Sequence, residues 1–302
     1  MSSTTQAMVP VIDFSNQNLK PGSPEWDLVK SQVREALEGY GCFAALFDPI
    51  LELRKAVFGA LQEPFRGYSC SPSGVFQSMA VDDAHIAENI EQCLTTSLWT
   101  QGNISFSKTL ASFIQLTSEL EKTILKMILE SFGLEKYMDE LTDIASYQLR
   151  IMKYEKPKAN EQTIGVPAHS DSNIMTLLYQ NEVNGLKIQS KDGEWMNLKL
   201  SPNSFIVIIG ECLCVWLNGR LSSPYHRVLM KGNDDRYSLG LFATVRGGYM
   251  VKVPTELVDD KNPMLFKPHD HEEFLKYFSS EVAKGVVKSG AAISRLKTYC
   301  AV

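Results

Sequence analysis

The spacing of apolar residues along the chain changes near residue 147. Before this point, apolar side chains recur three or four positions apart in long segments, which is the period of an α-helix. After it, short alternating or wholly apolar runs are separated by turn-forming residues, which is typical of β-strands. The pattern therefore predicts a helical first half and a β-rich second half.

The first half predicts two long helices. Ser23 suits the N-cap of the first, Pro24 suits its first helical position, and Gly39 and Gly41 mark its end. Gly133 can adopt the left-handed conformation that ends the second. The apolar stripes are Trp26, Val29, Val33, Leu37 and Tyr40 in the first helix and Leu110, Phe113, Leu120, Ile124 and Met127 in the second. Shorter predicted elements are strands at 9–14 and 42–47, a helix at 51–61 and a mobile or substrate-facing loop at 71–74.

The second half predicts a double-stranded β-helix, or jelly roll. The dipeptides Asp192-Gly193 and Asn218-Gly219 favour tight hairpin turns. We also predict an apolar strand that contains Cys212 and Cys214, and a helix from Glu272 to Phe278. The chain is interpreted as an N-terminal region of helices and strands, residues 1–140, packed against a jelly-roll domain, residues 141–302.

Composition narrows the classes of partner and compartment. The chain has 302 residues, with 30 Lys and Arg against 35 Asp and Glu, a formal net charge of −5, and no long basic run. We therefore expect a small-molecule partner rather than nucleic acid or an anionic membrane surface. Six cysteines without C-x-x-C pairs predict reduced, mostly buried thiols. Because no targeting segment or membrane-length apolar run is seen, we predict a cytoplasmic protein. We also expect it to be a monomer.

Three residues form a candidate metal site. His169 and Asp171 are two positions apart and His226 follows 55 positions after Asp171. Residues two apart on an extended strand point to the same side, so His169 and Asp171 can reach one ion. Two imidazoles and one carboxylate on one face of a metal leave other positions open, the arrangement of non-haem Fe(II) oxygenases. The set therefore predicts an iron site, with His169, Asp171 and His226 as catalytic ligands.

A second pair predicts an acidic co-substrate. Arg236 and Ser238 also have the two-residue spacing, so both can reach one carboxylate. The guanidinium of Arg236 is a rigid fork that matches a carboxylate. A surface ion pair of Arg236 with Asp234 and Asp235 is the alternative. Iron together with a dicarboxylate suggests 2-oxoglutarate.

With these residues in place, the chain resembles the plant soluble 2-oxoglutarate/Fe(II)-dependent dioxygenases, and most of all their AOP-like branch. The resemblance is carried by HSDSNIMTLLYQ, GLKIQSKDGEWMNL, SPNSFIVIIGECLCVWLNGR and SPYHRVLMKGNDDRYSLGLF. It is close from about residue 147 onward and looser before that point. The AOP-like branch includes enzymes that act on glucosinolates and on alkaloid-type metabolites.

The resemblance implies a reaction and further site residues. In such enzymes 2-oxoglutarate binds Fe(II), and with O2 it yields succinate and CO2 while a C–H bond of the acceptor is oxidised, with ascorbate as the expected reductant. Tyr154 could bond the other carboxylate of 2-oxoglutarate. Many relatives have an asparagine where this chain has Met152. We expect Phe242, the loop at 169–173 and the region near Phe76 to line the acceptor pocket, and an apolar acceptor to suit it better than a highly charged one.

Several alternatives remain open. The protein could bind a ligand without turnover, or it could be a cupin-like enzyme with another metal, which would have no use for Arg236 and Ser238. Desaturation, dealkylation or ring formation could replace hydroxylation. The segment His269-Asp270-His271-Glu272-Glu273 also contains metal-binding side chains. Since it precedes a predicted helix, we interpret Asp270 or a neighbour as a helix cap.

Overall fold

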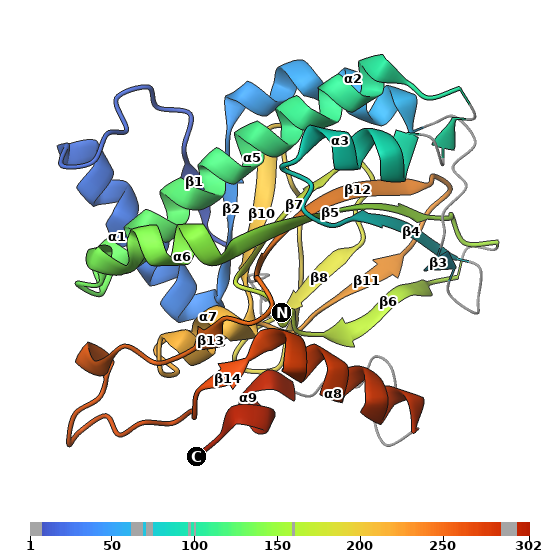
Figure 1. Ribbon diagram of the computed structural model, residues 1–302. Coiled ribbons are helices and arrows are strands. Elements are labelled where there is room, and N and C mark those ends of the chain that lie inside the picture. The colour runs from blue at the N-terminus through green and yellow to red at the C-terminus, as the bar shows by residue number, and fades with distance from the viewer. Residues whose placement is uncertain are drawn as a thin grey trace, which may run out of the picture.

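The computed structural model describes residues 8–61, 69–70, 75–95, 98–99, 101–158, 161–284 and 295–302. Its centre consists of an eight-stranded and a four-stranded sheet, which confirms the predicted jelly-roll core (Figure 1). In the large sheet the order is β1 (Val11–Asp13), β2 (Cys42–Leu46), β10 (Ser204–Ile209), β7 (Met175–Gln180), β12 (Arg236–Val245), β5 (Ala145–Tyr154), β4 (Phe76–Val81) and β3 (Ser69–Cys70). In the small sheet it is β6 (Thr163–His169), β11 (His226–Met230), β8 (Leu186–Gln189) and β9 (Trp195–Asn197).

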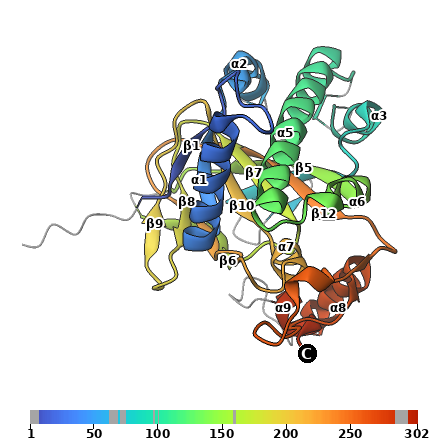
Figure 2. The ribbon, with the colours of Figure 1, turned by 90° about the vertical axis from the view of Figure 1, so that its left-hand side faces the viewer.

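Helices cover the outside of the large sheet and one end of the molecule (Figures 1 and 2). The helices are α1 (Pro24–Tyr40), α2 (Leu51–Ala60), α3 (Ala87–Ile90), α5 (Ile104–Ser131), α6 (Met138–Ile144), α7 (Glu211–Trp216), α8 (His271–Ala283) and α9 (Arg295–Cys300). Single helical turns lie at Asp48–Ile50, Glu91–Thr95, Glu135–Tyr137 and Thr255–Leu257, and β13 (Met250–Val251) pairs with β14 (His269–Asp270). Of the helices that the structure describes, none has both the length and the apolar character needed to cross a bilayer.

Alternation along the central strands separates the core from the site. On β5, Leu149 and Ile151 point to the outer face of the sheet, where they belong to the main apolar core beneath α5. Met152 and Tyr154 point to the opposite face and belong to a second apolar cluster with residues of the small sheet. The register of β12 with β5 places Arg236 opposite Tyr154 and Ser238 opposite Met152. The inner face of the large sheet therefore collects the predicted polar site residues.

Most predicted elements are present with shifted ends. The strands predicted at 9–14 and 42–47, the helices at 24–40 and 51–61, the long helix before Gly133 and the closing helix correspond to β1, β2, α1, α2, α5 and α8. The loop predicted at 71–74 lies outside the described residues. Because β1 to β4 join the large sheet, strands from both halves of the chain share it, and a division near residue 140 stays a prediction.

Three predictions in the second half have different outcomes. Asp192-Gly193 joins β8 to β9 as predicted, with Gly193 at φ 85°. The strand predicted around Cys212 and Cys214 is wrong, because both residues lie in α7. Every residue of α7 is buried, so no polar face revealed the helical period. The hairpin predicted at Asn218-Gly219 is wrong for the same reason: the turn follows α7, and the Gly219 N–H donates to Cys214 O at 2.8 Å.

Gly41 is expected to be far less replaceable than Gly39. Gly41 ends α1 at φ 69°, and an added Cβ would overlap the Ser222 carbonyl oxygen and lie 2.8 Å from Pro224 Cδ. Gly41→Ala should lower the free energy of unfolding by at least about 2 kcal/mol. Gly39 is helical, and nothing lies within 4 Å of its added Cβ, so Gly39→Ala should raise stability by up to roughly 1 kcal/mol. Urea unfolding of both variants measures the difference; equal effects would contradict it.

A buried carboxyl on α5 is expected to make stability depend on pH. Glu121 is 2% exposed and accepts a hydrogen bond from the Tyr147 hydroxyl at 3.0 Å. Burial raises the pKa of Glu121 from its usual 4.5 to about 7. Between these values the unfolded chain ionises first, so this group lowers stability as the pH rises through that window.

Replacing that carboxyl by an amide tests the effect. Glu121→Gln should raise the free energy of unfolding at pH 8 by up to roughly 3 kcal/mol relative to wild type, and by much less at pH 5. Urea unfolding at pH 5, 6, 7 and 8 gives the two curves. Curves that run parallel across this range would show that Glu121 does not titrate in the folded protein.

Candidate functional site

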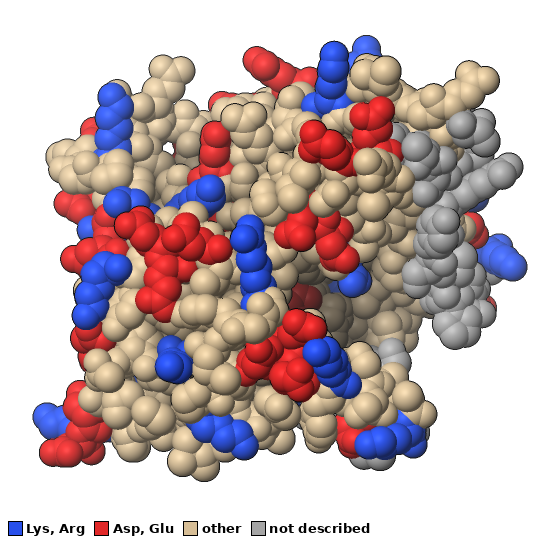
Figure 3. Space-filling view, in the orientation of Figure 1, with Lys and Arg blue, Asp and Glu red and all other residues tan. Residues whose placement is uncertain are grey.

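A cavity of about 1180 Å³ contains most of the predicted site. Figure 3 shows the face of the molecule hollowed near its centre, with acidic and basic side chains around the hollow. The predicted wall residues Phe76 and Phe242 and the loop at 169–173 all line it. Its lining extends from the three candidate metal ligands to Tyr154, but it does not include Arg236 or Ser238.

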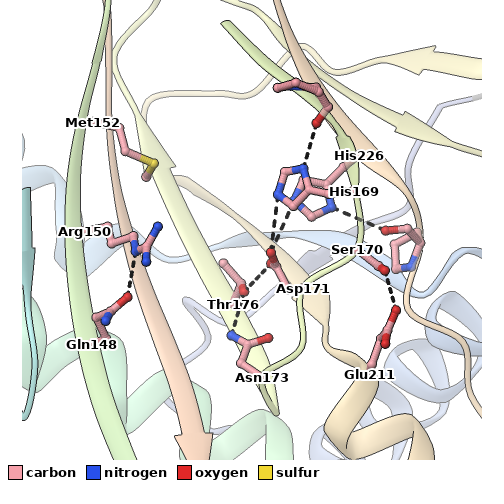
Figure 4. A network of polar contacts seen from close by, with 12 residues as sticks. Gln148, Arg150, Met152, His169, Ser170, Asp171, Asn173, Thr176, Glu211 and His226 are labelled. Atoms are coloured by element: carbon pink, nitrogen blue, oxygen red, sulfur yellow. Dashed lines mark hydrogen bonds and ion pairs between the residues drawn. The ribbon is translucent and has the colours of Figure 1, made fainter. Parts of the chain in front are cut away.

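The three predicted metal ligands meet in this cavity (Figure 4). His169 ends β6 and lies opposite His226, which begins β11. Asp171 lies two residues beyond the end of β6, so the expected strand stops at the first ligand. Asp171 Oδ1 is 3.6 Å from His169 Nε2 and 3.7 Å from His226 Nε2. Ligand atoms that share one ion at about 2.0–2.2 Å are about 3–4 Å apart, so the set fits a single metal ion.

Backbone carbonyls orient both imidazoles. His169 Nδ1 is 2.9 Å from Pro167 O, and His226 Nδ1 is 3.4 Å from Pro224 O. A carbonyl oxygen only accepts, so each Nδ1 must carry the proton in these bonds. Each Nε2 is then left with a free lone pair, which is the arrangement that a metal-binding histidine needs.

Asp171 is held by residues that sequence reasoning missed. Thr176 Oγ1 donates to Asp171 Oδ2 at 2.7 Å and in turn accepts from Asn173 Nδ2 at 2.9 Å (Figure 4). These bonds engage one carboxylate oxygen and leave Oδ1 toward the imidazoles. Thr176 is a polar residue on the inner face of the buried strand β7. A polar side chain within a mostly apolar strand is the sequence signal that could have identified it.

The electrostatics favour an ionised carboxylate at Asp171 and a neutral imidazole at His226. Burial and the nearby His169 lower the pKa of His226 to about 4, although Asp171 opposes them. Burial alone would raise the pKa of Asp171, but the two histidines and the Thr176 hydrogen bond outweigh it, and the net shift is downward. A carboxylate beside a neutral imidazole suits a divalent cation.

Arg236 and Ser238 are brought together as predicted, and Gln180 joins them. Arg236 and Ser238 are both 0% exposed. The guanidinium donates from Nε and Nη2 to Gln180 Oε1 at 3.3 and 2.9 Å, and from Nη1 to Ser238 Oγ at 3.3 Å. Among the described residues no acidic side chain forms an ion pair with it. A buried guanidinium without a counter-ion is costly unless an anionic ligand completes it.

Tyr154 lies between this group and the cavity. The Arg236 Cζ atom is 4.8 Å from the centre of the Tyr154 ring, and the Tyr154 hydroxyl is 3.6 Å from Met152 Sδ. Sulfur is a weak acceptor, so this contact holds the hydroxyl only weakly. Met152 occupies the position where relatives were expected to have an asparagine, and it supplies no strong hydrogen bond there.

The segment at 269–273 behaves as predicted at its centre. Asp270 caps α8 and accepts from the backbone N–H groups of Glu272 and Glu273 at 2.8 and 3.1 Å. Arg227, the residue after His226, lies over Trp195 with Cζ 3.9 Å from the ring centre.

Comparisons with known proteins agree with this geometry. Residues 145–245 match the 2OG-Fe(II) oxygenase superfamily. The chain is 42% identical to the "Probable 2-oxoglutarate-dependent dioxygenase AOP1.2" of Arabidopsis thaliana, over 91% of this chain and 92% of that protein. It is 29% identical to a "Probable inactive 2-oxoglutarate-dependent dioxygenase AOP2" of the same plant, over 97% of this chain and 98% of that protein.

Solved structures share the fold. A 2-oxoglutarate complex of the Arabidopsis thaliana dioxygenase for auxin oxidation 1 aligns with a TM-score of 0.73 and 24% identity, over 85% of this chain and all (100%) of that one. JOX2 in complex with 2OG, Fe and JA aligns with a TM-score of 0.77 and 19% identity, over 98% and 90%. The sequence identity to the AOP1.2 protein, over nearly the whole of both chains, shows the family. The chain belongs to the 2-oxoglutarate- and Fe(II)-dependent dioxygenases.

Proposed function

We propose that this dioxygenase hydroxylates a C–H bond of a plant specialised metabolite of alkaloid, glucosinolate or indole type, with release of succinate and CO2. His169, Asp171 and His226 would hold Fe(II), and Arg236, Ser238 and Tyr154 would hold 2-oxoglutarate. The observation that carries the proposal is the pairing of two donor sets. One is a His/Asp/His cluster with both Nε2 atoms free, and the other is a buried guanidinium without a described counter-ion.

Some residues of the chain would hold the iron and 2-oxoglutarate, and others orient those binding side chains. Bound iron would supply the activation of O2 that accompanies decarboxylation of 2-oxoglutarate, with ascorbate as the expected reductant. Thr176 and the Pro167 and Pro224 carbonyls fix the directions of the three ligands. Ser238 and Gln180 hold the Arg236 fork in a single orientation, ready for a carboxylate.

One residue of the cavity bears on the acceptor. Arg150 lines the cavity on the same inner face of β5 as Met152 and Tyr154, and its Cζ is 5.7 Å from the centre of the Phe242 ring. Its Nε donates to Gln148 Oε1 at 2.6 Å, and Gln148 Nε2 donates to Asp82 Oδ1 at 2.6 Å. A guanidinium beside an aromatic wall suits an acceptor with an apolar body and one acidic or hydrogen-bond-accepting group.

Replacing Arg150 is expected to affect acceptor binding alone. Arg150→Gln should raise the acceptor KM by roughly 10-fold or more, because a charge-assisted hydrogen bond is lost. The co-substrate KM should stay within about twofold of wild type. Steady-state kinetics with the acceptor and 2-oxoglutarate varied in turn measures both constants; an unchanged acceptor KM would place the acceptor elsewhere in the cavity.

The proposal is tested in two stages. Metal-free protein is loaded with Fe(II) without O2 and titrated with 2-oxoglutarate, and the visible metal-to-ligand charge-transfer band is followed. O2 is then admitted with candidate plant metabolites, and succinate and hydroxylated product are quantified. A charge-transfer band with succinate that one metabolite stimulates supports the proposal and identifies the acceptor.

The same experiment separates the alternatives. A ligand-binding member without turnover would show the band but no succinate with any metabolite. This alternative is worth testing because one relative is described as probably inactive. A cupin-like enzyme with another metal would show no band at saturating 2-oxoglutarate. Desaturation or dealkylation would give succinate with a product lacking the added oxygen.

A further inference from the structure

A second group of potential metal ligands lies at the C-terminal end of the fold, apart from the residues assigned above. Cys212 of α7, His269 of β14 and His271 of α8 have ligand atoms that all lie within 4.8 Å of one another. Their exposed fractions are 2%, 4% and 2%. We propose that these three side chains form a zinc site, which is separate from the His169, Asp171 and His226 set.

The histidines carry polar atoms that nothing else in the described chain satisfies. Both ring nitrogens of His269, and Nδ1 of His271, are buried without a hydrogen-bond partner among the described residues. Buried polar groups in folded proteins nearly always have a partner, so two unsatisfied imidazoles side by side need an explanation. A metal ion shared with a thiolate would satisfy a nitrogen of each ring at once.

The local structure explains why both imidazoles turn inward. His269 pairs with Val251 across β13 and β14, and His271 begins α8 two residues later. Asp270 between them turns to cap α8. The side chains on either side of it lie buried, with ring centres 6.5 Å apart. The alternation that makes Asp270 a cap therefore brings both histidines to α7, where Cys212 lies.

The donor set determines the class of ion. One thiolate and two imidazoles suit Zn²⁺, which favours sulfur and nitrogen ligands in tetrahedral geometry, whereas Fe(II) in the other set receives a carboxylate. Burial lowers the pKa of both His269 and His271, which favours the neutral ring that binds metals. Burial raises the pKa of the Cys212 thiol, so zinc would displace a proton on binding. The fourth position would be free for water, and His271 lines the large cavity, which gives an entry path.

Zinc at this position would join the C-terminal elements to the loop that carries Asp171. The α7 backbone is bonded to that loop, because the Glu211 N–H donates to Asp171 O at 2.8 Å and the Cys212 N–H donates to Asn173 O at 3.1 Å. The Glu211 side chain accepts from Ser170 Oγ and from the Leu296 N–H of α9. Occupancy should therefore raise the thermal stability of the C-terminal elements and of the active-site loop together.

Cobalt(II) distinguishes the two metal sites in the full-length protein. A Co(II) ion bound to a thiolate gives an intense near-ultraviolet charge-transfer band, and the His169, Asp171 and His226 set contains no thiolate. Metal-free wild-type protein titrated with CoCl2 is expected to bind two equivalents and to develop this band. Added ZnCl2 should abolish the band and raise the Tm.

Matched variants assign the band to its ligands. Cys212→Ser should remove the band and one equivalent of cobalt, whereas Cys214→Ser, two residues along the same buried helix, should keep both. His269→Gln should weaken cobalt binding at this site by at least about 10-fold. If circular dichroism shows that Cys212→Ser is unfolded, His269→Gln is the variant that tests the site. The absence of the band in wild type at saturating cobalt, or its survival in Cys212→Ser, would overturn the zinc site. Neither result depends on whether 2-oxoglutarate is turned over.

Discussion

Alanine at position 171 is expected to abolish 2-oxoglutarate turnover, with a loss of roughly 1000-fold or more in succinate formation, equivalent to about 4 kcal/mol of transition-state stabilisation. Asp171 would contribute the one negative ligand of the proposed set, and its Oδ1 lies 3.6 Å from His169 Nε2 and 3.7 Å from His226 Nε2. Without it, two neutral imidazoles would be left to hold the iron. Equilibrium dialysis of Fe(II) and succinate formation, each measured for Asp171→Ala, test the two aspects of this expectation.

Two further variants make the Asp171 experiment specific. Thr176→Val removes the hydrogen bond to Asp171 Oδ2 but leaves the ligand, so a loss of roughly 10- to 100-fold in metal affinity is expected. Asp139→Ala removes an exposed carboxylate of α6 and should change neither measurement. If Asp171→Ala retained wild-type iron affinity, the metal would have to be bound elsewhere.

The second large effect is expected at Arg236. Arg236→Ala should leave no measurable use of 2-oxoglutarate, because it removes the cationic fork proposed to hold the far carboxylate. Arg236→Lys keeps the charge without the fork and should raise the co-substrate KM by roughly 10- to 100-fold. Fe(II) binding should be retained in both variants. The measurements are a 2-oxoglutarate titration of the charge-transfer band and steady-state kinetics with 2-oxoglutarate varied.

The stability of Arg236→Ala distinguishes an arginine that binds 2-oxoglutarate from an arginine that supports the fold. The guanidinium is fully buried, and it contacts the side chains of Gln180 and Ser238 and the ring of Tyr154, none of which is a carboxylate. Because a buried charge without a counter-ion stabilises a fold little, Arg236→Ala should cost less stability than most substitutions of a large core residue. A variant that unfolds cooperatively at wild-type urea concentrations yet cannot bind 2-oxoglutarate supports the clamp. Unchanged 2-oxoglutarate affinity in that folded variant would refute it and revive the cupin-like alternative.

Much of the site could be predicted because its spacing follows from strand geometry. Arg236 and Ser238 lie on one face of β12, and His226 begins β11. The two-residue spacing also predicted that His169 and Asp171 lie together, which they do although the strand ends at His169. Short intervals along extended chain determine which side chains share a face, and that information is local.

What could not be predicted depends on pairing between distant segments. Gln180 reaches Arg236, 56 positions away, only because β7 pairs with β12. Cys212 and His269 are 57 positions apart, and nothing in either neighbourhood indicates the other. Cys212 lies in an apolar run that was predicted as a strand but forms the helix α7. A wholly buried segment has no polar face that would reveal its helical period.

The alternation along β5 and β12 has an evolutionary consequence. Leu149, Ile151 and their neighbours fasten the sheet to α5, while Arg150 and Phe242 on the other face meet the cavity. Because Arg150 and Phe242 lie outside the core cluster, substitutions at this proposed acceptor wall are expected to leave the packing against α5 intact, so selection can change which molecule is oxidised without first compensating for lost stability. A lineage of such enzymes can therefore diversify its chemistry through single substitutions on one side of a sheet whose other side stays constant.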